Sequence, residues 1–162
     1  MSGAELIRSA ASAADVAAAR ALFEEYAAAL DVDLCFQGFA QELESLPGAY
    51  APPRGRLLLA GAPSAPIGCV ALRPLPADGG ATEICEIKRL YVRPAARGTG
   101  LGAALARAIL AEARTIGYRE ARLDTLASMS AAQALYASLG FRECAPYYHN
   151  PLGGTVYMAL AL

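Results

Sequence analysis

A short glycine-rich segment, Arg97-Gly98-Thr99-Gly100-Leu101-Gly102, constrains the fold of this chain more than any other feature. The residues before it, Glu83–Val92, are rich in Ile, Leu, Tyr and Val, and this composition predicts a strand. The residues after it, Leu101–Ile116, repeat apolar side chains at helical spacing, which predicts a helix. A turn between a strand and a helix suits phosphate, because the first helical amides lack partners and glycine lets an anion reach them.

Two other kinds of glycine-rich turn fit this segment less well. A P-loop ends in Gly-Lys-Ser/Thr, and no lysine follows Gly102. A dinucleotide fingerprint is matched by Gly98, Gly100 and Ala103, but it should directly follow the first strand of a large parallel unit. Residues 93–97 intervene here, and too little chain follows for a dinucleotide domain. The spacing alone also leaves open a turn with a purely structural role.

Length and composition limit the remaining possibilities. The length of 162 residues predicts a single domain, residues 1–162, with a sizeable core. A net charge of −1 argues against a nucleic-acid partner. The four cysteines form no C-x-x-C pair and the chain has one histidine, so we expect no metal site. Since neither a signal peptide nor a membrane-spanning run is evident, we expect a cytoplasmic protein without a membrane partner.

Periodicity predicts further elements on both sides of this unit. Two capping-box signatures, Ser12-x-x-Asp15 and Ser130-x-x-Gln133, predict the starts of two helices. The other expected strands are Ala4–Arg8, Arg56–Gly61, Pro66–Leu75, Ala121–Leu126 and Thr155–Leu162, and the other expected helices run to Leu30, over Phe39–Leu46 and over Ala131–Leu139.

The glycine-rich segment and the strand before it carry a family resemblance. Arg97-x-x-Gly100-x-Gly102, after Leu90-Tyr91-Val92-x-Pro94, resembles motif A of the GNAT superfamily of N-acetyltransferases. The resemblance is strong from about Glu83 to Phe141. It implies an α/β fold of the α+β type, the GNAT fold, with a central mixed, mostly antiparallel sheet of about six or seven strands and about four flanking helices. It also implies that the sheet splays between its fourth and fifth strands.

The same resemblance implies that acetyl-coenzyme A is the co-substrate. In the family the glycine turn holds the pyrophosphate, and the strand before it pairs with the pantetheine arm as if the arm were an extra strand. Many members have an asparagine before the later helix, and Ser128 is our candidate for that contact here. The expected cofactor-binding residues are Leu90, Tyr91, Val92, Arg97, Gly98, Thr99, Gly100, Leu101, Gly102, Ala103 and Ser128.

Two residues are candidates for catalysis by this resemblance. Glu86 corresponds to the general base of the histone-acetyltransferase branch, and Tyr136 corresponds to a tyrosine that returns a proton to the leaving thiolate. Each has a structural alternative. Glu86 could be a solvent-facing residue or a partner for Lys88 or Arg89, and Tyr136 could be a buried aromatic. The strand period puts Glu86, Lys88 and Leu90 on one face unless a bulge intervenes.

The acceptor site is the least determined part of the chain. Tyr26, Phe36 and Phe39 could line a pocket, although plain core packing is the favoured explanation. After the last predicted helix, Tyr147, Tyr148 and Asn150 form a polar and aromatic cluster, and a rigid proline-rich loop is the competing explanation. The candidate substrate-binding residues are therefore Tyr26, Tyr147, Tyr148 and Asn150.

Together these features predict transfer of an acetyl group to a primary amine of a small molecule or peptide. Two alternatives stay open, a non-catalytic acyl-coenzyme A-binding regulatory module and a Rossmann-like oxidoreductase. Exposed strand edges would also allow a homodimer.

Overall fold

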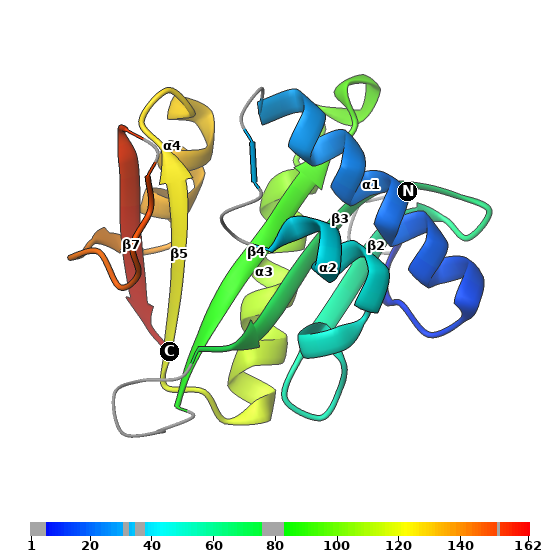
Figure 1. The fold of residues 1–162 in the computed structure, drawn as a ribbon, viewed down its shortest axis with the longest axis horizontal. Helices are drawn as coiled ribbons and strands as arrows, with labels where there is room; N and C mark the ends of the chain where they lie inside the picture. The colour runs from blue at the N-terminus through cyan, green and yellow to red at the C-terminus, as the bar shows by residue number, and fades with distance from the viewer. Residues whose placement is uncertain (1–5, 31–32, 35–37, 76–82, 152) are drawn as a thin grey trace.

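The computed structural model describes residues 6–30, 33–34, 38–75, 83–151 and 153–162. Its centre is one seven-stranded mixed sheet with the strand order β1-β2-β3-β4-β5-β7-β6 (Figure 1). The strands are β1 (Ile7–Ser9), β2 (Arg56–Ala62), β3 (Ala65–Pro74), β4 (Ile84–Val92), β5 (Glu120–Leu126), β6 (Arg142–Glu143) and β7 (Thr155–Ala161). The helices are α1 (Ala13–Leu30), α2 (Phe39–Ser45), α3 (Leu101–Ile116) and α4 (Ser130–Ser138), with short 3-10 turns η3 (Gly48–Tyr50) and η4 (Pro94–Ala96). This arrangement confirms the expected fold class.

The sheet divides at its single parallel pair of strands among the described residues. β4 and β5 pair only from Ile84 to Glu86 against Glu120 to Arg122, whereas all the other neighbouring strands are antiparallel. Beyond Glu86 the two strands diverge, as Figure 1 shows. The predicted splay between the fourth and fifth strands is therefore present, and it leaves the last part of β4 with a neighbour on one side only.

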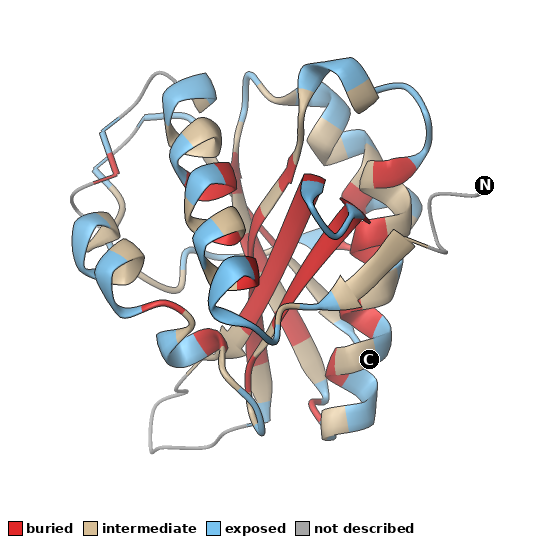
Figure 2. Ribbon diagram, turned by 90° about the vertical axis from the view of Figure 1, so that its right-hand side faces the viewer, coloured by how far each residue is buried: buried red, intermediate tan, exposed pale blue. Residues whose placement is uncertain are grey.

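Helices cover both faces of the sheet and form two cores. On one face the stripe of Leu101, Leu105 and Ile109 on α3 packs against the strands, together with Tyr136 of α4. On the other face a second core includes Phe23 of α1 and partly buried side chains of α2. Figure 2 shows the buried strands as a layer between the helices.

A bulge near the end of β4 changes which side chains share a face. Ala71 pairs with Lys88 and Cys69 with Tyr91, so β4 carries one residue more than β3 across this step. Arg89 takes up the extra residue with a φ of 61°, in the left-handed region. Leu90 consequently packs toward α3 and Tyr91 toward α1. The simple strand period that grouped Leu90 with Glu86 and Lys88 is therefore wrong.

The two predicted capping boxes have different outcomes. In the first, the amide of Asp15 donates to Ser12 Oγ (3.1 Å) and the amide of Ser12 donates to Asp15 Oδ2 (3.2 Å). The second is wrong: α4 has Met129 as its N-cap and no side-chain cap bond. Gln133 instead donates through Nε2 to the carbonyl oxygens of Leu126 and Ala127, at 2.9 and 3.1 Å. These two carbonyls at the end of β5 bind the Gln133 amide, which ties α4 to the strand.

Candidate active site

The glycine turn has the open geometry that an anion needs. Gly98 and Gly100 have φ values of 78° and 84°, and a Cβ added to either would meet no atom within 4 Å. Gly100 is the N-cap of α3, and Ala104 donates the first helical bond, to Gly100 O at 3.0 Å. The amides of residues 101–103 therefore precede the helical ladder and are available to an anion. Thr99 closes the turn by donating through Oγ1 to Ala96 O (2.7 Å).

Arg97 joins the glycine turn to the end of β4. Its Nε donates to Val92 O at 2.9 Å, and its guanidinium carbon lies 5.7 Å from the centre of the Tyr91 ring. The side chain is exposed, so a positive charge lies beside the open amides of the turn.

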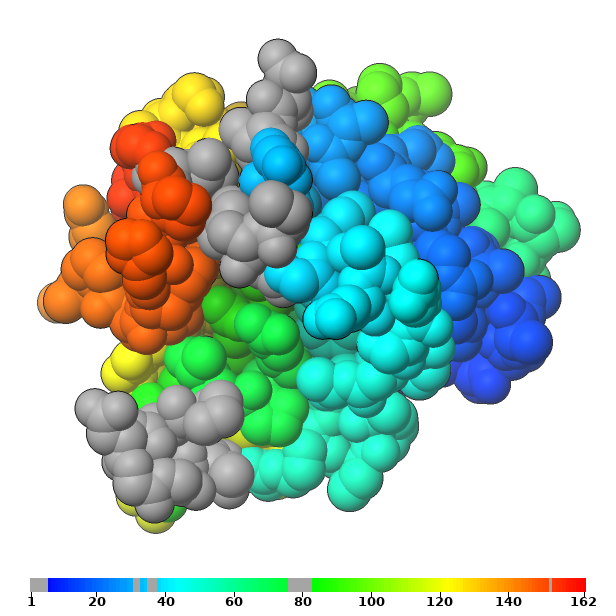
Figure 3. All heavy atoms as spheres, viewed as in Figure 1, coloured from blue at the N-terminus to red at the C-terminus, as the bar shows by residue number. Residues whose placement is uncertain are grey.

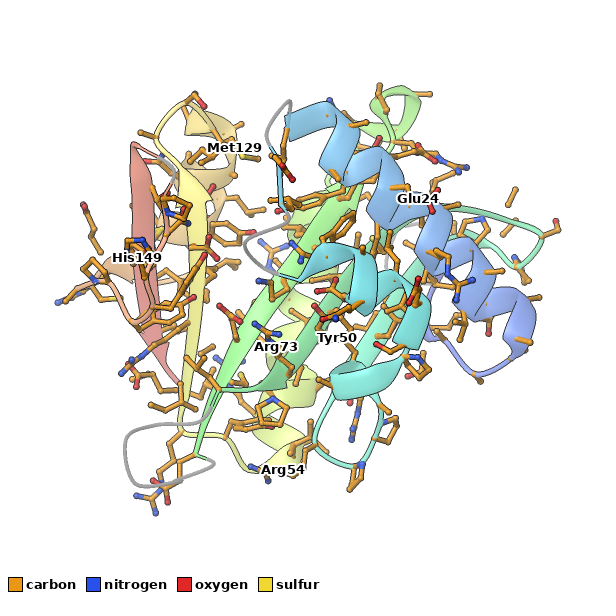
Figure 4. The ribbon with its side chains drawn as sticks, in the orientation of Figure 1. Glu24, Tyr50, Arg54, Arg73, Met129 and His149 are labelled. Carbon is orange, nitrogen blue, oxygen red and sulfur yellow. The ribbon has the colours of Figure 1, made fainter. Side chains whose placement is uncertain are left out.

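A groove of about 490 Å³ runs from Arg97 along the unpaired end of β4. Leu90, Tyr91 and Val92 form one wall, and the start of α4 with Ser128 forms the other. Met129, also in the wall, is labelled in Figure 4 at the α4 end of β5. The fold thus brings together, across the splay, the cofactor-binding candidates from β4, Arg97 and Ser128.

The groove continues into a smaller cavity of about 80 Å³, which we call the inner pocket. The two share Tyr26, Leu30, Leu90, Leu126, Met129 and Ala132. The polar side chains that line the inner pocket come from α1, β4, β5, α4 and the C-terminal loop: Tyr26, Lys88, Arg89, Asp124, Thr125, Tyr136 and Asn150.

Tyr136 lies in the inner pocket with 8% of its surface exposed. Its ring packs edge-on against Phe141, at 5.6 Å between centroids. Burial raises the pKa of the phenol well above its usual value, and the nearby Tyr26 and Asp124 add to the rise. Tyr136 is therefore a protonated donor at neutral pH.

Glu86 lies outside the inner pocket and is fully engaged. Its Oε1 accepts from Arg73, with nitrogens at 2.8 and 3.0 Å, and lies 3.9 Å from Lys88 Nζ. Its Oε2 accepts from the Tyr147 hydroxyl at 2.7 Å. With 1% exposure, Glu86 is not a solvent-facing residue. The partnership with Lys88 is present, and Arg73, labelled in Figure 4, is a closer partner that the sequence did not indicate.

Tyr147 and Tyr148 of the predicted cluster do not line the inner pocket. Tyr148 donates to Asp124 Oδ2 (2.7 Å) and accepts from Asn150 Nδ2 (3.1 Å). The rings of Tyr147, Tyr148 and Tyr157 lie 5.3–5.6 Å apart. Burial chiefly raises the pKa of both Tyr147 and Tyr148, and the neighbouring carboxylates add to it. Of the three loop candidates, Asn150 alone is in the pocket lining, and His149 is exposed.

Tyr26 lines both the groove and the inner pocket, as a pocket residue was expected to do. The guanidinium carbon of Arg89 lies 5.5 Å from its ring and 5.1 Å from the ring of Phe39. Phe39 itself packs in the α1 and α2 core, and Phe36 lies outside the described residues.

Sequence reasoning missed several charged residues of the site. Arg89, which is 2% exposed, makes a two-pronged ion pair with Glu42, with both nitrogen–oxygen distances at 2.9 Å. Lys88 and Asp124 face the inner pocket from opposite strands. The bulge that turns Lys88 and Arg89 toward one side has no local sequence signal, and the partners lie far apart in the chain.

Two negative findings apply to the described part of the chain. No group of three His, Cys, Asp or Glu residues there is placed to hold a metal ion. None of the helices described is long and apolar enough to cross a membrane.

Comparison with known proteins agrees with this geometry. The model of the acetyltransferase (GNAT) family matches residues 19–141. An uncharacterised N-acetyltransferase of Schizosaccharomyces pombe is 41% identical over 142 residues, which are 87% of this chain and 85% of the relative.

Solved structures show the same fold. An acetyltransferase from Streptococcus agalactiae has a TM-score of 0.74 at 19% identity, over 96% of this chain and 97% of that one. An acetyltransferase from Salmonella typhimurium, solved with its cofactor acetyl-CoA, has a TM-score of 0.67 at 25% identity, over 96% of this chain and 92% of its own. With its open glycine turn, its splayed sheet and these relatives, the chain belongs to the acetyltransferase (GNAT) family.

Proposed function

We propose that this chain transfers the acetyl group of acetyl-coenzyme A to a primary amine of a small molecule or peptide. The observation that carries the proposal is the continuity of the groove with the inner pocket. An unpaired strand edge and a buried phenol line this path, and the glycine turn with its open helix amides adjoins the groove at Arg97. The acetyl-CoA in the Salmonella typhimurium neighbour supports the same ligand here.

Each part of the path has a proposed task. The amides after Gly100 and the guanidinium of Arg97 bind the diphosphate. The backbone of Leu90 to Val92 hydrogen-bonds the pantetheine arm, since this end of β4 lacks a neighbour on the β5 side. Ser128 contributes from the opposite wall. The thioester then reaches the inner pocket at Tyr136.

The reaction needs one bond to form and one to break. The amine nitrogen bonds to the acetyl carbonyl carbon, the carbon–sulfur bond breaks, and the thiolate takes a proton from Tyr136. The amine loses a proton on the way. For a lysine-like amine, with a pKa near 10.4, deprotonation at pH 7 costs about 4–5 kcal/mol. For an α-amino group, with a pKa near 8, it costs about 1–1.5 kcal/mol.

Glu86 is the proposed acceptor of that proton. Because Glu86 does not line the pocket, the proton reaches it through a water or through Lys88, which lines the pocket and lies 3.9 Å from Glu86 Oε1. Asp124 is the carboxylate in the pocket lining and is the competing candidate.

The direct test is release of coenzyme A thiol, with the acetylated product identified by mass spectrometry. Amines, amino acids, peptides and aminoglycosides serve as acceptors. We expect amine-dependent release and an acetylated amine. Tight binding of acetyl-coenzyme A with no release across the panel would instead indicate a non-catalytic acyl-coenzyme A-binding module.

A further inference from the structure

The last part of β4 depends on an unusual backbone conformation at Arg89. Its φ of 61° lies in the left-handed region, which is less favourable for a residue with a side chain than for glycine. Bulges whose first residue is left-handed ordinarily have glycine there. Arg89 is buried and directly precedes Leu90–Val92, the strand edge proposed to bind the pantetheine arm. Whatever stabilises Arg89 in this conformation therefore also shapes that edge.

Helix α2 supplies two of the groups that hold the Arg89 side chain. Glu42 accepts two hydrogen bonds, from Nε and Nη2 of Arg89, and each is 2.9 Å long. The side chains of this ion pair are 1% and 12% exposed, for Arg89 and Glu42 respectively. The guanidinium also lies against the ring of Phe39 on α2 and the ring of Tyr26 on α1. A two-pronged pair between an arginine and a carboxylate fixes direction as well as distance.

The bulge decides which backbone groups of β4 face the open edge. Along a strand, successive residues direct their N–H and C=O groups alternately to the neighbours on the two sides. Between Lys88 and Tyr91, β4 has one residue more than β3, so the sides are exchanged for every later residue compared with an uninterrupted strand. Another conformation at Arg89 would present different groups of Leu90–Val92 to the pantetheine arm.

We propose that Glu42 is a positioning residue for acetyl-coenzyme A. Through its two hydrogen bonds it holds Arg89 in the left-handed conformation, and it thereby keeps Leu90–Val92 in the register that binds the ligand. Glu42 itself lines neither the groove nor the inner pocket, so it acts through Arg89. This inference rests on the proposed binding of acetyl-coenzyme A along β4 and extends the site to a helix outside the groove.

The first test removes the charge of Glu42. Without the carboxylate, the end of β4 should leave the binding register for part of the time. A ligand that binds one of two conformations has an apparent Kd that rises as the competent fraction falls. The strain of one left-handed residue corresponds to a factor of about 5 to 30 in such an equilibrium. Glu42→Gln should therefore raise the Kd for acetyl-coenzyme A, measured by calorimetry, by about 5- to 30-fold.

Two double variants give the sharper test. E42Q/R89G and E42Q/R89A both remove the entire ion pair, so neither leaves a buried charge without its partner, and they differ from each other by one methyl group. Glycine adopts a positive φ without support, whereas alanine does not. We expect E42Q/R89G to bind acetyl-coenzyme A about 5- to 30-fold more tightly than E42Q/R89A. A role of Glu42 in stability alone would give equal affinities.

Glu112→Gln is the control for the loss of an ion pair. Glu112 of α3 accepts from Nε of Arg56 at 2.9 Å, and it lines neither the groove nor the inner pocket. Thermal denaturation should show a loss of stability in both Glu42→Gln and Glu112→Gln, and the loss should be larger for Glu42, whose side chain is less exposed. Only Glu42→Gln should lose affinity for acetyl-coenzyme A.

The outcomes separate this inference from acetyl transfer. Equal affinities of E42Q/R89G and E42Q/R89A, or an equal loss of affinity in Glu42→Gln and Glu112→Gln, would overturn the positioning role and leave acetyl transfer intact. Tight binding by the unaltered protein without acetylation of any amine would overturn the proposed transferase function and leave the role of Glu42 intact. Failure of the unaltered protein to bind acetyl-coenzyme A would overturn both.

Discussion

Tyr136 is one of three hydroxyl side chains that line the inner pocket, with Tyr26 and Thr125, and it is the proposed proton donor to the departing sulfur. It lines the cavity from α4, opposite the end of β4, and Phe141 holds its ring. Its raised pKa keeps the proton on the phenol even where an ordinary tyrosine, with a pKa near 10, begins to ionise. We therefore expect no decline in activity from this group up to about pH 10.

Tyr136→Phe should lower kcat about 100-fold, because proton transfer by a positioned acid contributes about this much or more. The affinity for acetyl-coenzyme A, measured by calorimetry, should stay unchanged. Tyr118→Phe is the matched control, since Tyr118 is also a buried tyrosine but donates to Arg54 O, at 2.7 Å, and is absent from the groove and pocket linings. An undiminished kcat in Tyr136→Phe would remove the phenol from the reaction.

Glu86 and Asp124 can be distinguished by the pH dependence of the rate. If Glu86 accepts the proton, Glu86→Gln should flatten the rise of kcat/KM with pH, whereas Asp124→Asn should mainly raise the KM of the amine. The opposite result would assign the base to Asp124. Because Glu86→Gln also leaves the cations of Arg73 and Lys88 with less compensation, its thermal stability should fall and has to be measured alongside.

At the scale of elements, the glycine at the start of α3 has two proposed roles: it takes up a left-handed backbone conformation, and it leaves room for an anion. A comparison with the glycine at the end of the same helix can separate these roles. Gly100 and Gly117 cap the two ends of this helix with φ values of 84° and 107°, and a Cβ added to either meets no atom within 4 Å. Alanine at either position costs about 1–2 kcal/mol of stability, because both lie in the left-handed region.

The ligand should distinguish these two glycines. Gly100→Ala should weaken acetyl-coenzyme A binding by about 10-fold or more, since the methyl group displaces an anion from the helix amides. Gly117→Ala should lose similar stability and keep full affinity. Calorimetry gives the affinities and thermal denaturation gives the stabilities. Equal affinities in the two variants would show that the turn does not hold the ligand.

The elements with strong local signals are those that the sequence predicts well. The apolar stripe of α3 and the reciprocal cap at Ser12 and Asp15 need only nearby residues, and both appear as expected. The family motif also leads to the groove. The sequence leaves a bulge in this strand open but does not place it at Arg89, because a non-glycine residue with positive φ is stabilised by tertiary contacts, here with Glu42 and two aromatic rings.

The charged network escapes prediction for the same reason. Arg73, Glu86 and Tyr147 come from β3, β4 and the C-terminal loop, and only the assembled sheet brings them together. The sequence therefore predicts where the cofactor path begins better than it predicts how the acceptor pocket is charged.

At the scale of the whole molecule, the site lies between two parts of the sheet. Figure 3 shows the green surface of β4 between the cyan atoms of α2 and the orange atoms of the C-terminal loop. The two parts share few backbone pairs, because β4 and β5 pair over three residues each. A ligand that contacts both walls would therefore stabilise the entire fold.

Acetyl-coenzyme A at 100 times its Kd should add about 2.7 kcal/mol to the stability of the folded protein. For a domain of this size that corresponds to a rise in Tm of about 5–10 °C. Differential scanning calorimetry measures the shift, and Gly100→Ala should show a smaller one at the same concentration. A Tm that does not depend on ligand would contradict binding at the groove.

The homodimer remains a prediction at this scale. The edge strands β1 and β6 have three and two residues, so each offers few open backbone groups to a second copy. Light scattering across a range of protein concentrations measures the oligomeric state directly.

Lys88 also gives the experimenter a spectroscopic label that few proteins offer. Since the chain has no other lysine, reductive methylation with isotope-enriched formaldehyde would produce one side-chain methyl signal besides that of the N-terminal amine. That signal would come from the wall of the inner pocket, so its chemical shift would report, without any mutation, when a small molecule enters the cavity.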